Sequence, residues 1–209
     1  MKNNEAFEAV KEIRVMMEKS SRFLSFSGTS AILIGLYALA GAFIAQGIIM
    51  SSKYTPGDYS APTWVVIAPD IIIIALIVFV LSLTTVLFFS VRKAKRMEAP
   101  FISGPAYRTF LNFFLPLMVG GIFSVALLIS GNIGIIAPVM LLFYGLSLIN
   151  ASKYTYGSIF WLGCGELLIG LICAFSPGHG LLLWSLGFGV LHIIYGIYFF
   201  FRVERDSKA

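Results

Sequence analysis

Three ionisable residues lie inside long apolar stretches of this sequence, namely Asp70, Glu166 and His192. An ionisable side chain is costly in the hydrocarbon region of a membrane, and it usually marks an ion pathway, a proton relay or a ligand site. If both stretches are helical, Glu166 and His192 lie at similar depths, about 12 to 14 Å from the same membrane surface. They therefore become the first candidates for chemistry.

Small residues accompany both candidates and would let their helices approach closely. The glycines on the same helical faces are Gly163 and Gly170 in the first stretch, and Gly189 and Gly196 in the second. We therefore expect Glu166 and His192 to meet, or to share a small wet cavity, with Tyr195 near enough to join. Glu166, His192, Tyr195 and Asp70 are the candidate residues of a ligand or ion pathway.

Two interpretations of the Glu166 and His192 pair stay open. Burial opposes the charge of a carboxylate, whereas a neighbouring imidazolium favours it, so the charge of such a pair responds to its surroundings. This favours a titratable or ligand-binding centre. The alternative is a buried hydrogen bond that fixes helix register, worth about 0.6 to 2 kcal/mol.

Asp70 directly follows Pro69, about 9 Å inside the outer edge of its stretch. A proline within a helix frees a backbone carbonyl, which can line a polar site. We place Asp70 toward the outer mouth of a pathway, and a helix kink whose acid reaches outward is the alternative.

We expect no cofactor, no metal and no enzymatic activity. His179 and His192 would be about 20 Å apart along a helix, too far to clamp one haem iron. Cys164 and Cys173 fall on roughly opposite helical faces, beyond the reach of a disulfide. The sequence also lacks the common catalytic and nucleotide-binding signatures.

The elements that position these residues are membrane helices. The chain has 209 residues, of which 58% are hydrophobic and 12% charged, with a mean hydropathy of +0.91, and no soluble class has this composition. We predict an all-α, polytopic membrane bundle, with short connections that make tight hairpins of the third and fourth helices and of the fifth and sixth. The six predicted spans are residues 23–49, 64–91, 109–129, 133–150, 157–175 and 181–201.

Lys and Arg residues set the orientation. Fourteen of the 15 fall on one side of the predicted spans, and Lys53 alone falls on the other. Because cytoplasmic loops are rich in these residues, both termini should face the cytoplasm across an inner membrane. The same rule explains the basic run at residues 92–96, so we expect no nucleic-acid partner.

The predicted organisation is a cytoplasmic amphipathic helix (1–22), a membrane domain (23–203) and a short cytoplasmic tail (204–209). The first helix either lies on the membrane surface or docks a soluble partner through residues 5–20. A homo-oligomer is left open. The lipid bilayer is the one certain environment of such a chain.

A short motif at residues 52–57 recurs at residues 152–157, each time between two apolar stretches. The stretch after each copy contains one acid, Asp70 or Glu166. Helices one to three (23–129) would then correspond to helices four to six (133–203) with inverted orientation, an arrangement typical of transporters.

Two segments, residues 187–198 and 16–25, resemble those of a family of small six-helix inner-membrane proteins from Bacteroidota-type bacteria. The resemblance implies a membrane location and no particular activity. The function that the residues favour is a small permease or channel-like protein for a proton, ion or small solute. The alternative is a non-transporting membrane sensor or scaffold with a cytoplasmic partner.

Overall fold

The computed structural model describes residues 26–52, 61–96 and 103–204. The predicted amphipathic helix at 1–22, its docking segment at 5–20 and most of the predicted tail lie outside these ranges. So does most of the first copy of the repeated motif, at residues 52–57.

Every regular element in the described ranges is helical, which confirms the all-α fold. The first two long helices are α2 (Gly28–Ser51) and α3 (Ala61–Arg96). They are followed by α4 (Gly104–Ile129), the short η1 (Ile133–Ile135), α5 (Ile136–Ser152) and α6 (Ser158–Ala174). The last stretch is continuous and comprises α7 (Gly180–Ser185), the π-helical η2 (Leu186–Leu191), α8 (His192–Phe199) and η3 (Phe200–Glu204).

Five of these helical stretches are long and apolar enough to cross a membrane, whereas α6 is apolar but has only 17 residues. The chain is therefore an all-α bundle with helices of membrane-spanning length. One difference from the predicted spans is in α3, which continues beyond residue 91 to Arg96. Those added residues are mostly basic, so they extend α3 past the apolar region rather than within it.

Local sequence explains where the helices start and stop. The Ser103 hydroxyl accepts a hydrogen bond from the backbone N–H of Ala106 at the start of α4, as N-cap serines do. Gly131 and Gly178 have φ angles of 76° and 85° in the turns after α4 and α6. Glycine adopts this left-handed backbone without a steric penalty, so both predicted hairpin turns can be tight.

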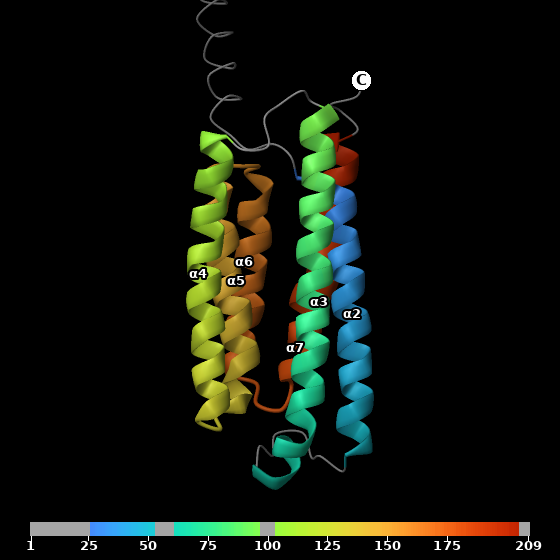
Figure 1. Ribbon diagram of the computed structural model, residues 1–209, viewed down its shortest axis with the longest axis vertical. Coiled ribbons are helices and arrows are strands. Elements are labelled where there is room, and N and C mark those ends of the chain that lie inside the picture. The colour runs from blue at the N-terminus through green and yellow to red at the C-terminus, as the bar shows by residue number, and fades with distance from the viewer. Residues whose placement is uncertain (1–25, 53–60, 97–102, 205–209) are drawn as a thin grey trace, which may run out of the picture.

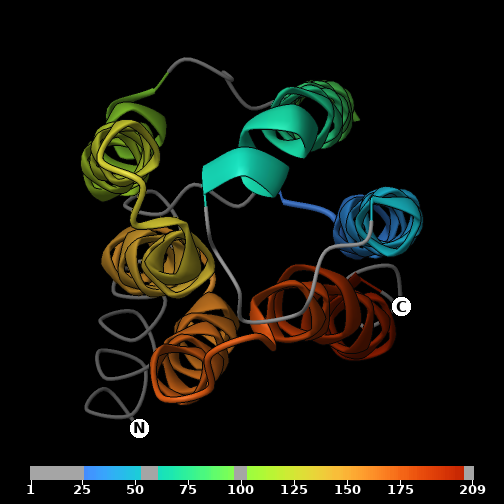
Figure 2. The ribbon, with the colours of Figure 1, turned by 90° about the horizontal axis from the view of Figure 1, so that it is seen from below.

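The helices form an open ring (Figures 1 and 2). Helix α3 packs on α2, which packs on the α7–η2–α8 stretch; α6 packs on that stretch and on α5, and α5 packs on α4. The ring is open between α3 and α4, although these helices are consecutive in the chain. Figure 2 shows this opening from below, opposite α6.

Glycines make the closest helix contacts. A Cβ at Gly163 of α6 would lie 2.8 Å from the carbonyl oxygen of Gly145 in α5, and one at Gly35 of α2 would lie 2.6 Å from that of Gly189. No larger residue fits at these positions without moving a backbone. Close contact between glycine-bearing faces is the usual means of packing helices in membranes.

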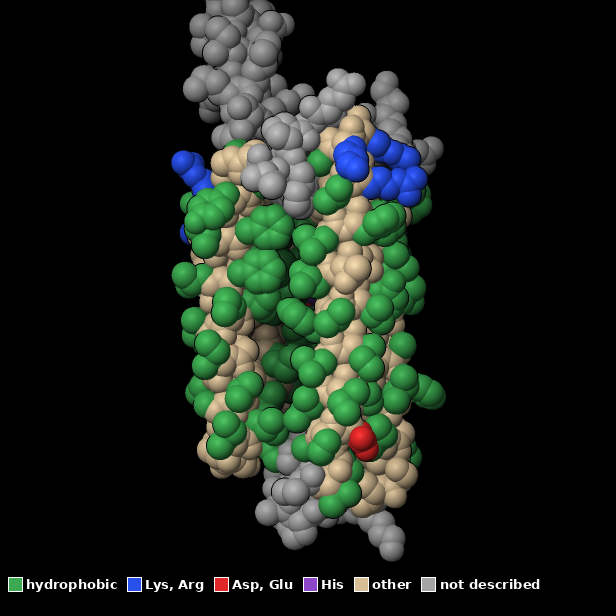
Figure 3. Space-filling view, viewed as in Figure 1, with side chains coloured by type: hydrophobic (Ala, Val, Ile, Leu, Met, Phe, Trp, Pro, Cys, Tyr) green, Lys and Arg blue, Asp and Glu red, His purple; other side chains and the backbone are tan. Residues whose placement is uncertain are grey.

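The described Lys and Arg side chains gather at one end of the bundle (Figure 3). They come from the end of α3, the start of α4, the α5–α6 turn and the end of the last helix, and comprise Arg92, Lys93, Lys95, Arg96, Arg108, Lys153 and Arg202. This clustering matches the one-sided distribution expected from the sequence, and the assignment of this end to the cytoplasm stays a prediction.

Candidate functional site

Glu166 and His192 meet in the interior of the bundle. Nδ1 of His192 lies 3.3 Å from Oε1 of Glu166, which confirms the contact expected from their matched depths. The two residues are 0% and 2% exposed, respectively. An acid and an imidazole this deeply buried have little contact with water, so their polar partners must come from the protein.

The imidazole of His192 has two further polar neighbours. The backbone carbonyl oxygen of Gly187 lies 3.2 Å from Nδ1, and the hydroxyl of Tyr144 lies 2.7 Å from Nε2. Because Nδ1 faces two acceptors, it holds the proton in the neutral ring, and the Tyr144 hydroxyl then donates to Nε2. In the charged ring, Nε2–H instead donates to the tyrosine oxygen.

Neither carboxylate oxygen of Glu166 has a hydrogen-bond partner among the described residues. Oε1 is within ion-pair distance of His192, but the geometry there is not that of a hydrogen bond. Oε2 faces Gly187, where an added Cβ would approach it to 2.5 Å. Buried polar atoms are nearly always hydrogen-bonded, and an exception calls for a specific explanation.

The helical stretch that contains His192 changes its winding just before this residue. The π-helical segment η2 ends at Leu191, and it includes Gly187 and Gly189. Short π-helical turns within α-helices are frequent at functional sites. Here the segment brings the Gly187 carbonyl within reach of the imidazole five residues later.

Aromatic rings enclose the polar groups. The ring of Tyr144 lies 4.8 Å from that of Phe188 and 5.9 Å from that of Phe113, measured between centroids. Phe188 also stacks on His192, with centroids 6.2 Å apart and an interplanar angle of 13°. The cluster of Glu166, His192 and Tyr144 is therefore surrounded by groups that compete poorly for its protons.

The four predicted site residues separate in the structure. Glu166 and His192 form the buried contact. Tyr195 instead bonds to Ser158, with 3.1 Å between the two hydroxyl oxygens, so it does not join the pair as expected. Asp70 is exposed on α3, in the part of that helix far from its basic end, and no described contact links it to the pair.

Tyr144 is the functional candidate that the sequence argument missed. It lies about two turns before the end of α5, and Glu166 lies about two turns after the start of α6. Since α5 and α6 are antiparallel neighbours, these positions have the same depth. The depth comparison used for the ionisable residues would have found Tyr144 if hydroxyl groups had been included.

Within the described ranges no three His, Cys, Asp or Glu residues are placed to hold a metal ion. Cys164 and Cys173 are both free thiols. What the cluster can do chemically is transfer protons: imidazole accepts a proton at one nitrogen and releases one from the other. Tyr144 and Glu166 lie on these two sides of the ring.

No protein-family model, curated protein or solved structure matches this chain.

Proposed function

We propose that this chain is a small permease that moves protons, alone or with a small solute, through a centre formed by Glu166, His192 and Tyr144. The observation that supports this function is the carboxylate of Glu166, which is fully buried beside an imidazole and accepts no described hydrogen bond. A carboxylate kept only for structure would be expected to have its oxygens satisfied. One that must gain and lose a proton cannot be permanently saturated with donors.

The cluster supplies a route with balanced proton transfers. When a proton reaches the half-buried Tyr144, the hydroxyl oxygen takes it up and passes its own proton to Nε2 of His192. The imidazolium then turns so that Nδ1–H points at Oε1 of Glu166, 3.3 Å away, and releases this proton to the carboxylate. The imidazole is then neutral with its proton on Nε2, and Glu166 is protonated. A further cycle requires the ring to return to the Nδ1–H form.

Both ionisable residues are sealed in this conformation, since Glu166 is 0% and His192 is 2% exposed. Transport therefore requires a second conformation in which Glu166 contacts water. The π-helical segment beside His192 is a suitable place for such a change, because its winding differs from that of the α-helix on either side. The inverted repeat, which would suit this function, remains a prediction.

The test is proton flux in liposomes of purified protein, with a pH-sensitive dye inside and a potassium diffusion potential as the driving force. Wild type is compared with Glu166→Gln, His192→Ala and Asp70→Asn, and the folding of each is verified by thermal unfolding. Glu166→Gln and His192→Ala should each abolish proton flux although the protein still folds. Asp70→Asn is a matched control because it makes the same acid-to-amide change at an exposed position.

Two results would overturn the proposal. One is an absence of proton flux in correctly folded wild type, and the other is flux of wild-type size in folded Glu166→Gln. The sealed pair then favours the second function, a non-transporting sensor or scaffold in which Glu166 and His192 hold α6 against α8. In that case both variants should lose thermal stability.

A further inference from the structure

The apolar faces of α3 and α4 on either side of the opening are not covered by another described helix. Helix α3 packs extensively only on α2, and α4 only on α5 and the short η1, as far as the described residues show. In the most apolar 18-residue segment of α3, no residue is buried within the chain. In the corresponding segment of α4, 6% of the residues are buried. In a bilayer, the space between these helices opens sideways into the hydrocarbon region.

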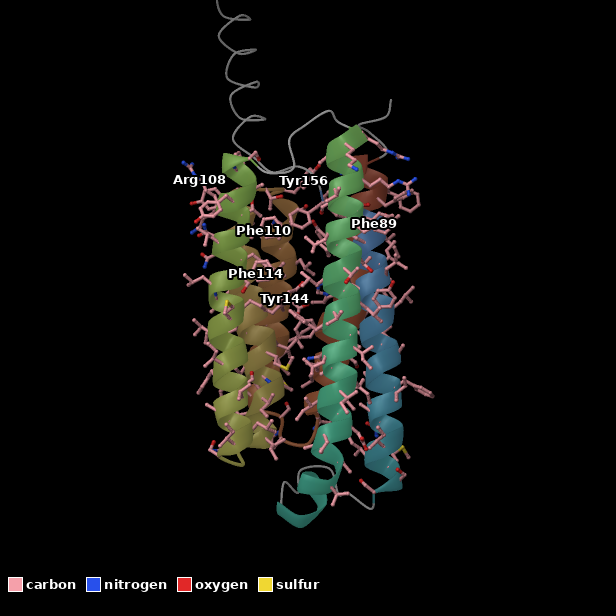
Figure 4. The ribbon with its side chains drawn as sticks, viewed as in Figure 1. Phe89, Arg108, Phe110, Phe114, Tyr144 and Tyr156 are labelled. Atoms are coloured by element: carbon pink, nitrogen blue, oxygen red, sulfur yellow. The ribbon has the colours of Figure 1, made fainter. Side chains whose placement is uncertain are left out.

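The walls of this opening are aromatic on one side. Phe110 and Phe114 of α4 stack with their centroids 5.9 Å apart, and the Phe113 ring meets that of Tyr144 edge to face. Figure 4 shows Phe110, Phe114 and Tyr144 along the side where α4 and α3 face each other. Figure 3 shows this face hollowed between the two helices, with hydrophobic side chains on both walls.

A cation lies at the basic end of the opening and points inward. Nζ of Lys93 donates to the backbone carbonyl oxygen of Phe26, 2.6 Å away, and lies 3.4 Å from the hydroxyl of Tyr156. It is also 5.4 and 5.5 Å from the ring centroids of Tyr156 and Phe199. The charge bias of the membrane explains why a lysine is at this end. These contacts hold its ammonium group toward the interior, whereas Lys95 stays exposed.

We propose that the space between α3 and α4 holds one anionic phospholipid from the leaflet at the basic end of the bundle. Its phosphate lies near Lys93, and an acyl chain runs along Phe110 and Phe114 toward Tyr144. Basic pockets between membrane helices are known to suit anionic head groups, and the aromatic wall suits a hydrocarbon chain. The proposal does not depend on transport by the Glu166 centre.

Charge favours a lipid over a second copy of the chain. Two copies in one membrane have the same orientation, so contact through α3 and α4 would place their basic ends side by side. Such a contact would bring together the exposed cations of both copies, which repel one another. They are Arg92, Lys95, Arg96 and Arg108 in each copy. An anionic phospholipid instead adds negative charge at this end.

Native mass spectrometry of the full chain tests the site, with phosphatidylglycerol and phosphatidylcholine added at equal concentrations. Wild type should retain one phosphatidylglycerol in preference to phosphatidylcholine. Lys93→Gln should lower this preference by about fivefold, the effect of one cation at a membrane surface, and Lys93→Arg should preserve it. Lys95→Gln is the matched control because it removes the same charge two residues away, and it should have a smaller effect.

A second measurement locates the acyl chain of the bound lipid even if Lys93→Gln does not fold. In Phe114→Trp, the added tryptophan emission, taken as the difference from wild type, should be quenched more by phosphatidylglycerol with brominated acyl chains than by the phosphatidylcholine analogue. Equal quenching by the two lipids would overturn the proposal. So would equal effects of the Lys93→Gln and Lys95→Gln variants, or a protein dimer that carries no lipid.

Discussion

The hydroxyl of Tyr144 lies 2.7 Å from Nε2 of His192, on the opposite side of the imidazole from Glu166. Helices α5, α6 and α8 thus each contribute one member of a linear arrangement, with the histidine in the middle. Tyr144 is half-buried whereas Glu166 is fully buried. The tyrosine is therefore the more accessible end of this arrangement, and Glu166 is its sealed end.

Replacement of Tyr144 by Phe should separate proton transfer from folding. The variant loses one hydrogen bond, so the free energy of unfolding should fall by about 1 kcal/mol. Proton flux should fall by about tenfold or more, because the chain of donors and acceptors is broken. Tyr195→Phe is the control: it also loses one hydroxyl contact, to Ser158, but should retain flux. Equal flux in the two variants would exclude Tyr144 from the route.

Gly187→Ala should disturb the site directly. The new Cβ would lie 2.5 Å from Oε2 of Glu166 and 2.5 Å from Cδ2 of Leu141, and crowding of this kind typically costs about 1 to 3 kcal/mol. The measurement is thermal unfolding in detergent. In a Glu166→Ala background the carboxylate is gone, so the same change should cost less. Additive effects in this double-mutant cycle would contradict the contact.

The contact between α5 and α6 should tolerate no side chain at Gly163. An alanine Cβ there would lie 2.8 Å from the Gly145 carbonyl oxygen, which forces the two helices apart and lowers the unfolding temperature. Gly47→Ala is the matched control in α2, because an added Cβ meets nothing within 4 Å. It should leave stability unchanged or raise it slightly through higher helix propensity.

The basic end of the bundle should be cytoplasmic. A fluorescent protein fused after residue 209 should fold and emit, because it does so in the cytoplasm. Alkaline phosphatase fused after Asn132, in the turn at the opposite end of the bundle, should be active outside. Inactive phosphatase there, with active phosphatase at the C-terminus, would reverse the orientation that the Lys and Arg residues predict.

Much of the fold and part of the site could be predicted because helical rise is fixed. Counting residues from the ends of two apolar stretches was enough to bring Glu166 and His192 together. Tyr195 could not be placed in this way. It lies three residues beyond His192 on α8, whereas Ser158 lies eight residues before Glu166 on the antiparallel α6, so residue counting alone does not predict their contact.

The open ring could not be predicted from hydrophobic pattern. Lipid chains are as apolar as leucine, so membrane helices need no polar face where they meet lipid, and α3 is apolar on nearly all sides. Its neighbours are determined by local fits such as Gly41 against Val78, where an added Cβ would approach within 2.6 Å. The π-helical segment was also missed, since the periodicity argument assumes uniform α-helical winding.

The shortness of α6 makes bilayer thickness relevant to the site. Its 17 residues rise about 25 Å, less than the hydrocarbon core of about 30 Å. Trp161, Leu168 and Leu171 of this helix are 75%, 61% and 52% exposed. As a membrane span, α6 would therefore require local thinning of the lipid next to it. Because Glu166 is on the same helix, a thicker membrane pulls on the element that holds the buried acid, whereas a thinner one relaxes it.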